Sequence, residues 1–356
     1  MNIKMEEILK FAVANKASDV HLISDVSPKI RVNGELLNIA GFEKADKKEI
    51  TEMVLSLLDE KQLEIFKTEK ELDFSFDAAG GTRIRANVYL QKGEASAALR
   101  LISSKIPTFE ELGIPDILKT FAKYKQGFVL VTGPTGHGKS TTVAAILEEI
   151  NATRGGHIVT IEDPVEYLIK PEKAIISQRE MGGDTNSFSL SLRSCLRQDP
   201  NVVFLGEMRD LESTSSALTI AETGHLVFSV LHTNSAAQTI DRIIDVFPSD
   251  AKDQIRVQLS TVITAIVSQR LVPAIDGGRI PVFEILIATP AVRNVIREGK
   301  SFMIDNIIQT SSDIGMISFD AYMAKLVLDG KVSEEVAMSY STNPVELQSK
   351  LRRQKI

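Results

Sequence analysis

The spacing of apolar and polar residues divides the chain into two parts. In the first hundred residues, helical periodicity over 5–13 and 47–67 alternates with short strand-like segments, and hairpin turns are predicted at Asn33-Gly34 and Gly80-Gly81. Nearly uninterrupted apolar runs then alternate with helical stretches; these runs are residues 128–132, 157–161, 202–205 and 226–231. The first pattern predicts a small α+β domain. The second predicts a doubly wound, largely parallel sheet, so the overall class is α/β.

The boundary between the two predicted domains is a linker over residues 103–113, where Pro107 biases the residue before it away from helix. The first domain then covers residues 1–102, and the second covers residues 114–356. From about residue 250 helical periodicity dominates, so we expect the second domain to end in a helical region.

Arginines gather on one face of the first predicted domain. Period-2 alternation over residues 83–90 directs Ile84, Ala86, Val88 and Leu90 inward. Arg83 and Arg85 then share the other face, and Arg100 lies in a further predicted strand. Each arginine alone is expected to be a surface or ion-pair residue. The shared face of Arg83 and Arg85 makes this pair a candidate for neutralising transition-state charge in a neighbouring subunit.

Composition limits the classes of protein that fit. Of the 356 residues, 43% are hydrophobic and 25% are charged, which is ordinary for a folded chain of about two domains. The net charge of −6 argues against nucleic acid as the main ligand. The single cysteine excludes an intrachain disulfide and fits a cytoplasmic location. The sequence predicts neither a signal peptide nor an apolar span of about 20 residues, so we expect no direct membrane insertion.

The strongest chemical signal is the segment Gly-Pro-Thr-Gly-His-Gly-Lys-Ser at residues 133–140, between a predicted buried strand and a predicted helix. Such a loop surrounds phosphate oxygens with backbone N–H groups at a helix N-terminus. Lys139 is expected to reach the β- and γ-phosphates of ATP, and the Ser140 hydroxyl is expected to bind Mg²⁺. The predicted nucleotide-binding residues are Gly133, Pro134, Thr135, Gly136, His137, Gly138, Lys139, Ser140 and Thr141.

Three carboxylates, Glu162, Asp163 and Glu166, follow the apolar run at 157–161. In an open α/β sheet this end of a strand faces the ligand crevice. Acids there can hold Mg²⁺ through water or orient an attacking water, so Glu162 and Asp163 are candidate magnesium ligands beside Ser140. The alternative is that Asp163 and the following proline only start a turn or cap a helix.

A second buried run, residues 202–205, also ends in an acid. Many phosphate-loop enzymes carry a magnesium-binding Asp at the strand end, but here Gly206 occupies that position and Glu207 follows. We therefore expect Glu207 to be the general base that polarises the water attacking the γ-phosphorus. Arg209, two residues later, is a further candidate site residue, with an ion-pair role as the alternative.

Two histidines, His225 and His232, bracket the apolar run at 226–231. A histidine at a strand end is commonly a structural hydrogen-bonding group, so structural and catalytic roles stay open for both. In a catalytic role, His232 would hydrogen-bond the γ-phosphate and signal its presence. Joint zinc coordination is not expected, since an extended strand separates the two rings.

Taken together, these segments resemble four motifs of the type II/IV secretion ATPases. Residues 133–140, 160–166, 206–210 and 223–234 look like the Walker A, Asp box, Walker B and His box of that family, and 17–22 resembles the start of its N-terminal PAS-like domain. Residues 291–300 are similar to a C-terminal segment linked to pilus retraction. The resemblance favours the retraction branch, as do the absent four-cysteine element and the absent long N-terminal extension.

The resemblance implies a PAS-like N-terminal domain followed by a RecA-like ATPase domain, assembled as a homohexamer. The arginines acting across subunit interfaces would be Arg83, Arg85 and Arg100. ATP hydrolysis would turn an inner-membrane platform protein of the PilC type and drive pilin subunits back into the membrane. The protein would be peripheral at the inner membrane through that partner, with no nucleic acid bound.

Three other functions stay open from the sequence. A pilus-assembly or type II secretion ATPase would use the same fold with the opposite direction of work. A ring that binds ATP without useful turnover is disfavoured by the intact Lys139 and Glu207. A nucleic-acid translocase is disfavoured by the acidic balance and by the His box.

Overall fold

The computed structural model of this chain describes residues 2–32, 34–39, 41–42, 46–78, 81–102, 105–208 and 210–353. The chain forms two compact units. The first is Met1–Lys105 together with the short segments Glu166–Leu168 and Gly182–Asp184, and the second is the remainder from Ile106 onward. Among the described residues, no helix has both the length and the apolar character needed to cross a bilayer.

The described residues of the first unit form a six-stranded antiparallel sheet in the order β3-β2-β1-β6-β5-β4, with three helices. Its elements are α1 (Ile3–Ala14), β1 (Asp19–Leu22), β2 (Lys29–Val32), β3 (Glu35–Asn38), α2 (Lys47–Leu55), α3 (Glu60–Glu69), β4 (Glu71–Ala78), β5 (Thr82–Gln91) and β6 (Glu94–Leu101). Helix α1 begins where the Asn2 side chain accepts a hydrogen bond from the Lys4 N–H, a cap that satisfies one free donor of the first turn.

The hairpin turns of the first unit and the inward face of β5 are both predicted from the sequence. Gly34 and Gly81 have φ of 90° and 79°, while Asn33 and Gly80 lie outside the described residues. Ile84, Ala86 and Val88 are fully buried, as the alternation predicts. The inward prediction for Leu90 is wrong, because this side chain is 38% exposed next to the β5–β6 turn, where the sheet runs past its core.

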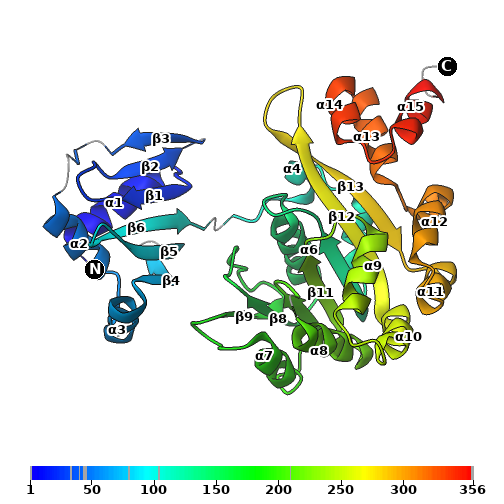
Figure 1. Cartoon of the computed structure of the whole chain (residues 1–356), viewed down its shortest axis with the longest axis horizontal. Helices are drawn as coiled ribbons and strands as arrows, with labels where there is room; N and C mark the ends of the chain where they lie inside the picture. Colours follow the sequence, from blue (N-terminus) through cyan, green and yellow to red (C-terminus); the bar gives the residue numbers. More distant parts are fainter. Residues whose placement is uncertain are drawn as a thin grey trace. The chain divides into compact units, whose positions relative to one another are not determined.

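The second unit contains a seven-stranded sheet in the order β13-β12-β7-β11-β10-β8-β9, parallel except for the edge strand β13 (Figure 1). Its strands are β7 (Gly127–Thr132), β8 (Gly156–Glu162), β9 (Ala174–Glu180), β10 (Val202–Leu205), β11 (Leu226–Leu231), β12 (Ile263–Pro273) and β13 (Arg279–Ile287). The four apolar runs of the sequence correspond to β7, β8, β10 and β11. The predicted parallel sheet is therefore confirmed.

Helices flank this sheet and continue beyond it. They are α4 (Phe109–Leu112), α5 (Asp116–Phe121), α6 (Lys139–Thr153), α7 (Phe188–Cys195), α8 (Leu211–Glu222), α9 (Ala236–Asp245), α10 (Lys252–Val262), α11 (Pro290–Arg297), η1 (Ser301–Met303), α12 (Ile304–Thr310), η2 (Ser312–Ile314), α13 (Phe319–Leu328), α14 (Glu334–Tyr340) and α15 (Pro344–Arg353). Part of the expected linker is not a free connector. Thr108 and Glu111 form a capping box that starts α4, and Phe109 is buried in the core.

The expectation that helices dominate from about residue 250 is wrong for residues 263–287. This segment forms β12 and β13, and an uninterrupted helical region begins only at Pro290. Strand β12 lies between β7 and β13, so most of it is buried. The β12 sequence, ITAIVSQRLVP, mixes apolar and polar residues without a strict period of two, so periodicity alone does not separate it from a buried helix.

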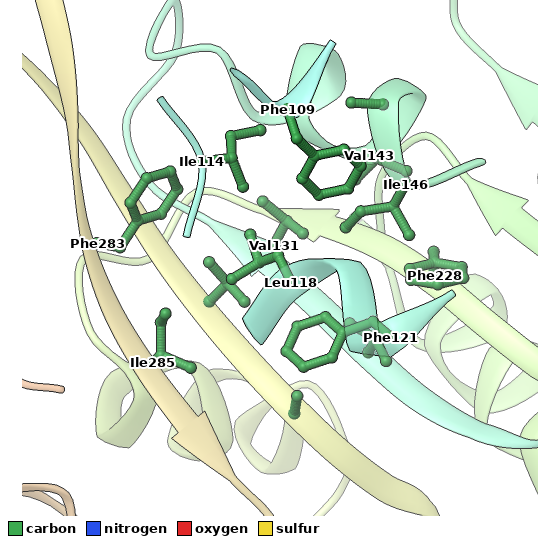
Figure 2. Close-up of a cluster of buried hydrophobic side chains, with 14 of the residues drawn as sticks. Phe109, Ile114, Leu118, Phe121, Val131, Val143, Ile146, Phe228, Phe283 and Ile285 are labelled. Carbon is green, nitrogen blue, oxygen red and sulfur yellow. The ribbon is translucent and has the colours of Figure 1, made fainter. Parts of the chain in front are cut away.

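Two apolar cores cover the two faces of the sheet, and strand β7 contributes to both. Val129 and Val131 belong to one core, and Phe128 and Leu130 belong to the other. Figure 2 shows part of the first core, in which side chains from α5, α6, β7 and the β12–β13 hairpin converge. Burial on both faces fixes the position of β7, and with it the start of the loop that follows.

Candidate active site

The loop between β7 and α6 is shaped by three glycines with positive φ. Gly133, Gly136 and Gly138 have φ of 141°, 76° and 79°, a region that other residues rarely adopt. A Cβ on Gly133 would lie 2.1 Å from the carbonyl oxygen of Gln269, and one on Gly138 would lie 3.0 Å from Gln269 Nε2. The loop therefore approaches β12 too closely for larger residues.

The first turn of α6 follows this loop directly, with Gly138 as N-cap and Lys139 as the first helical residue. Among the described residues, no side chain caps this turn. Its backbone N–H groups and the positive end of the helix dipole together form a site for an anion. This is the arrangement that the sequence motif predicts for phosphate binding.

Replacing Gly133 by alanine is expected to lower the free energy of unfolding by at least about 2 kcal/mol, since the new Cβ would both clash and strain the backbone. Denaturant unfolding measures this change. Gly277→Ala in the β12–β13 turn is the matched control, because Gly277 also has positive φ (88°) but a Cβ there would meet no atom within 4 Å. Equal losses in the two variants would contradict the close approach to Gln269.

Lys139 lies beside His232, where the β7–α6 loop ends and α6 begins. Its side chain is buried, and its Nζ donates a hydrogen bond to the carbonyl oxygen of Pro134 at 2.8 Å. The same Nζ is 3.5 Å from Nδ1 of His232, and the Thr135 hydroxyl is 3.3 Å from that ring nitrogen. The residue that follows β11 therefore contacts the β7–α6 loop, which is the predicted phosphate-binding loop.

Glu207 completes this group of side chains. Its Oε2 is 3.7 Å from His232 Nε2, and its side chain is only 13% exposed. The preceding residue, Gly206, donates its N–H to the carbonyl oxygen of Ile161 at 2.9 Å, and a Cβ there would lie 3.2 Å from Glu162 Cα. A side chain at position 206 would thus crowd the Glu162 backbone, and the acid follows one residue later.

The three carboxylates at and just after the end of β8 have different surroundings. Glu162 is buried, and its Oε1 accepts hydrogen bonds from the Thr160 hydroxyl at 2.6 Å and from Gln178 Nε2 at 3.4 Å. Asp163 and Glu166 are exposed. Since Ile161 pairs with Leu205, Glu162 and Glu207 come from neighbouring strand ends.

Magnesium binding at this site would depend on few protein groups. Within the described ranges, no cluster of three or more His, Cys, Asp or Glu side chains is able to hold a metal ion. Ser140, in the first turn of α6, and Glu162, at the end of β8, are oxygen donors of the type that Mg²⁺ prefers. Such a sparse set suits an ion that keeps waters and shares phosphate oxygens.

Several predicted residues lie outside this group. His225 lies before β11, with its Nδ1 3.0 Å from the Thr223 hydroxyl and 3.1 Å from the Ile220 carbonyl oxygen. The whole of β11 separates it from His232, a distance of about 20 Å at the usual rise per residue. Arg209 lies outside the described residues.

The predicted arginines share the sheet of the first unit. Arg85 and Arg100 are register partners on β5 and β6. Arg100 Nε donates to Asp19 Oδ1 at 2.9 Å, and Arg83 Nη1 is 3.3 Å from Asp77 Oδ2. Arg83 and Arg100 therefore make ion pairs within their own unit.

Sequence reasoning missed the polar support that β12 gives to the loop. The Thr142 hydroxyl donates to Gln269 Oε1 at 2.7 Å, and Gln269 Nε2 donates to the carbonyl oxygen of His137 at 2.8 Å. The N–H of Leu271 donates to His137 Nδ1 at 2.8 Å. No motif marks these residues, because their partners are about 130 positions away in the sequence.

His137 is held in its neutral form. Burial lowers its pKa, and the positive charges of Arg279, Lys139 and Arg270 lower it further. A neutral ring can accept the hydrogen bond from Leu271, whereas a protonated ring could not. His137 therefore fixes the loop to β12 through its neutral ring.

Comparison with known proteins places this geometry in context. The family model described as "Type II/IV secretion system protein" matches residues 2–278. A type IV pilus retraction ATPase, PilT, of Pseudomonas aeruginosa is 44% identical over 338 residues, covering 95% of this chain and 98% of that protein. A twitching motility protein of Neisseria gonorrhoeae is 44% identical over 322 residues, covering 90% of this chain and 86% of that protein. The crystal structure of a pilus retraction motor, PilT, with bound ADP superposes with a TM-score of 0.91 at 42% identity, covering 98% of this chain and 99% of that one.

Proposed function

This chain belongs to the Type II/IV secretion system protein family, and from that premise we propose that it is an ATPase motor that retracts type IV pili. The observation that carries the proposal is the convergence of Lys139, His232 and Glu207 beside an uncapped helix N-terminus. The direction of work follows from the similarity to a named retraction ATPase over almost the whole chain.

The chemistry is hydrolysis of the β–γ phosphate bond of ATP to ADP and inorganic phosphate. The loop N–H groups and Lys139 bind the phosphates, and their positive charge stabilises the transition state. Glu207 orients the attacking water and takes its proton, while His232 contacts the γ-phosphate and links its presence to Glu207. A bound Mg²⁺, held by Ser140 and Glu162 and through water by Asp163, would neutralise phosphate charge.

The assembly that we propose is a homohexamer in which the first unit is PAS-like, over about residues 1–102, and the second is RecA-like, from about residue 114. Arg83, Arg85 and Arg100 would act on the nucleotide of a neighbouring subunit. Hydrolysis would move the two domains relative to one another and turn an inner-membrane platform protein of the PilC type. The motor would lie at the cytoplasmic face of that membrane through this partner.

Hexamer formation is tested by multi-angle light scattering of the purified chain with and without ATP. We expect a mass near six times 39.1 kDa in at least one of the two conditions. The expectation rests on the family relationship and on arginines that lie in a separate unit from the phosphate-binding loop. A strict monomer in both conditions would contradict the ring.

The proposed direction of work is tested in a deletion strain of the source organism, scored by imaging labelled pili. We expect pili that extend but do not shorten, with loss of twitching, and restoration of both by the intact gene. A strain that makes no pili would assign the protein to assembly instead.

A further inference from the structure

Glu284, on strand β13, is a buried carboxylate to which the proposed chemistry assigns no role. Its neighbours Phe283 and Ile285 point into the apolar core drawn in Figure 2. Strand alternation directs the Glu284 side chain the other way, toward the start of α9. A carboxylate is costly to bury, so its position calls for a specific partner.

The partner is the first N–H of α9. Glu284 Oε1 accepts a hydrogen bond from the Ala236 N–H at 2.7 Å. Ala236 lies four residues after His232, and the intervening loop makes short-range bonds within the described chain, such as that from the Gln238 N–H to the Ser235 hydroxyl at 3.3 Å. Glu284 therefore connects the end of the His232 loop to the central sheet.

A second contact connects the same hairpin to the phosphate-binding loop. Glu284 is the register partner of Ser268 on β12. The Ser268 hydroxyl is 3.0 Å from the hydroxyl of Thr132, the residue immediately before Gly133. The β12–β13 hairpin thus contacts the start of the phosphate-binding loop on one strand and the end of the His232 loop on the other.

We propose that Glu284 is a positioning residue that holds His232 against the phosphate-binding loop, and that its ionised form does so more strongly than its neutral form. The inference rests on the proposed ATPase activity. The physical reason is that a carboxylate accepts a stronger hydrogen bond than a carboxylic acid, and it also favours the positive end of α9. Loss of this acceptor would free the loop that carries His232.

Burial, more than the surrounding charges, puts the ionisation of Glu284 near neutral pH. Burial raises the pKa of Glu284 to about 7, and the hydrogen bond from Ala236 opposes that rise. Asp305 on α12 raises the pKa, Arg270 on β12 lowers it, and Asp320 on α13 raises it. All four charged side chains line one cavity of about 340 Å³, which gives protons a path to the carboxylate.

The test compares steady-state ATP hydrolysis by the full chain and by Glu284→Ala, Glu284→Gln and Glu346→Gln. Glutamine keeps an acceptor for the Ala236 N–H but carries no charge, whereas alanine removes both. The Glu346 side chain lines the same cavity and accepts hydrogen bonds from Gln309 and Ser318, so Glu346→Gln is the matched control.

We expect Glu284→Ala to lower kcat about tenfold with KM for ATP changed less than about twofold, because a displaced group at the reacting centre affects turnover more than binding. Glu284→Gln should restore most of this loss near pH 6. The ratio of wild-type to Glu284→Gln kcat should then rise to about fivefold near pH 8, as the wild-type carboxylate ionises. Glu346→Gln should follow the wild-type profile.

A wild-type protein with no hydrolysis would contradict the proposed function. If wild type hydrolyses ATP, two results would overturn the positioning role instead. One is a kcat of Glu284→Ala equal to that of wild type. The other is a ratio of wild-type to Glu284→Gln kcat that stays constant from about pH 6 to about pH 8.

A thermal unfolding series checks the titration without using activity. Because the folded-state pKa of Glu284 is raised above its ordinary value of 4.5, its stabilising contribution is complete below that value and is lost as pH rises through about 7. The thermal unfolding midpoint of Glu284→Gln minus that of wild type should therefore increase between pH 4.5 and about pH 7. A constant difference would show that Glu284 does not ionise there, and would overturn the charge-dependent part of the proposal.

Discussion

Replacement of Lys139 by alanine is expected to abolish nucleotide binding. The buried ammonium lies at the first residue of α6, 2.8 Å from the Pro134 carbonyl oxygen and 3.5 Å from His232. In the proposed function it is the charge that binds the β- and γ-phosphates. Charge-assisted hydrogen bonds contribute about 1.5–3 kcal/mol each, so losing two of them weakens binding by at least ~10²-fold.

Isothermal titration with ATP, or with a fluorescent ATP analogue, measures the effect directly. Lys173→Ala is the matched control, because Lys173 is an exposed lysine of the same unit, outside the phosphate-binding loop. Thermal unfolding of both variants separates lost binding from lost structure. Normal affinity in a folded Lys139→Ala protein would contradict the assignment of the phosphate-binding site.

Replacement of Glu207 by alanine is expected to separate binding from chemistry. The carboxylate lies 3.7 Å from His232, just after the end of β10, and its negative charge does not attract the phosphates of ATP. ATP should therefore bind normally, while turnover should fall at least ~10²-fold, the loss typical of a missing general base.

Isothermal titration with ATP measures binding by this variant, and a phosphate-release assay measures its turnover. Glu212→Ala, which removes an exposed carboxylate in the first turn of α8, should leave both unchanged. Near-normal hydrolysis by Glu207→Ala would move the role of base to Glu162, the neighbouring strand-end carboxylate. Glu162→Gln would then become the variant to measure.

The parts of the fold that the sequence predicts are those with a local signature. The runs that became β7, β8, β10 and β11 are short, apolar and bounded by turn residues, so their pattern reports burial directly. The phosphate-binding loop is recognisable because three glycines and a lysine must have fixed spacing. Glu207 is recognisable by its position after a buried strand.

Other parts depend on contacts between distant segments. The segment 263–287 carries apolar residues without a clear period, and its identity as β12 and β13 is settled by pairing beside β7. Gln269 and Glu284 have no motif, since each acquires a partner only when this hairpin joins the sheet. The crowding at Gly206 is equally hidden in the sequence, because it comes from the backbone of Glu162, which would lie 3.2 Å from an added Cβ.

The central claim is that ATP is hydrolysed where Lys139, His232 and Glu207 meet, and its most direct test is release of inorganic phosphate by the purified full chain. With ATP and Mg²⁺ present, and with assembly verified by light scattering, we predict continuous phosphate release by wild type and almost none by Glu207→Ala. An assembled wild-type protein that releases no phosphate under these conditions would contradict the account.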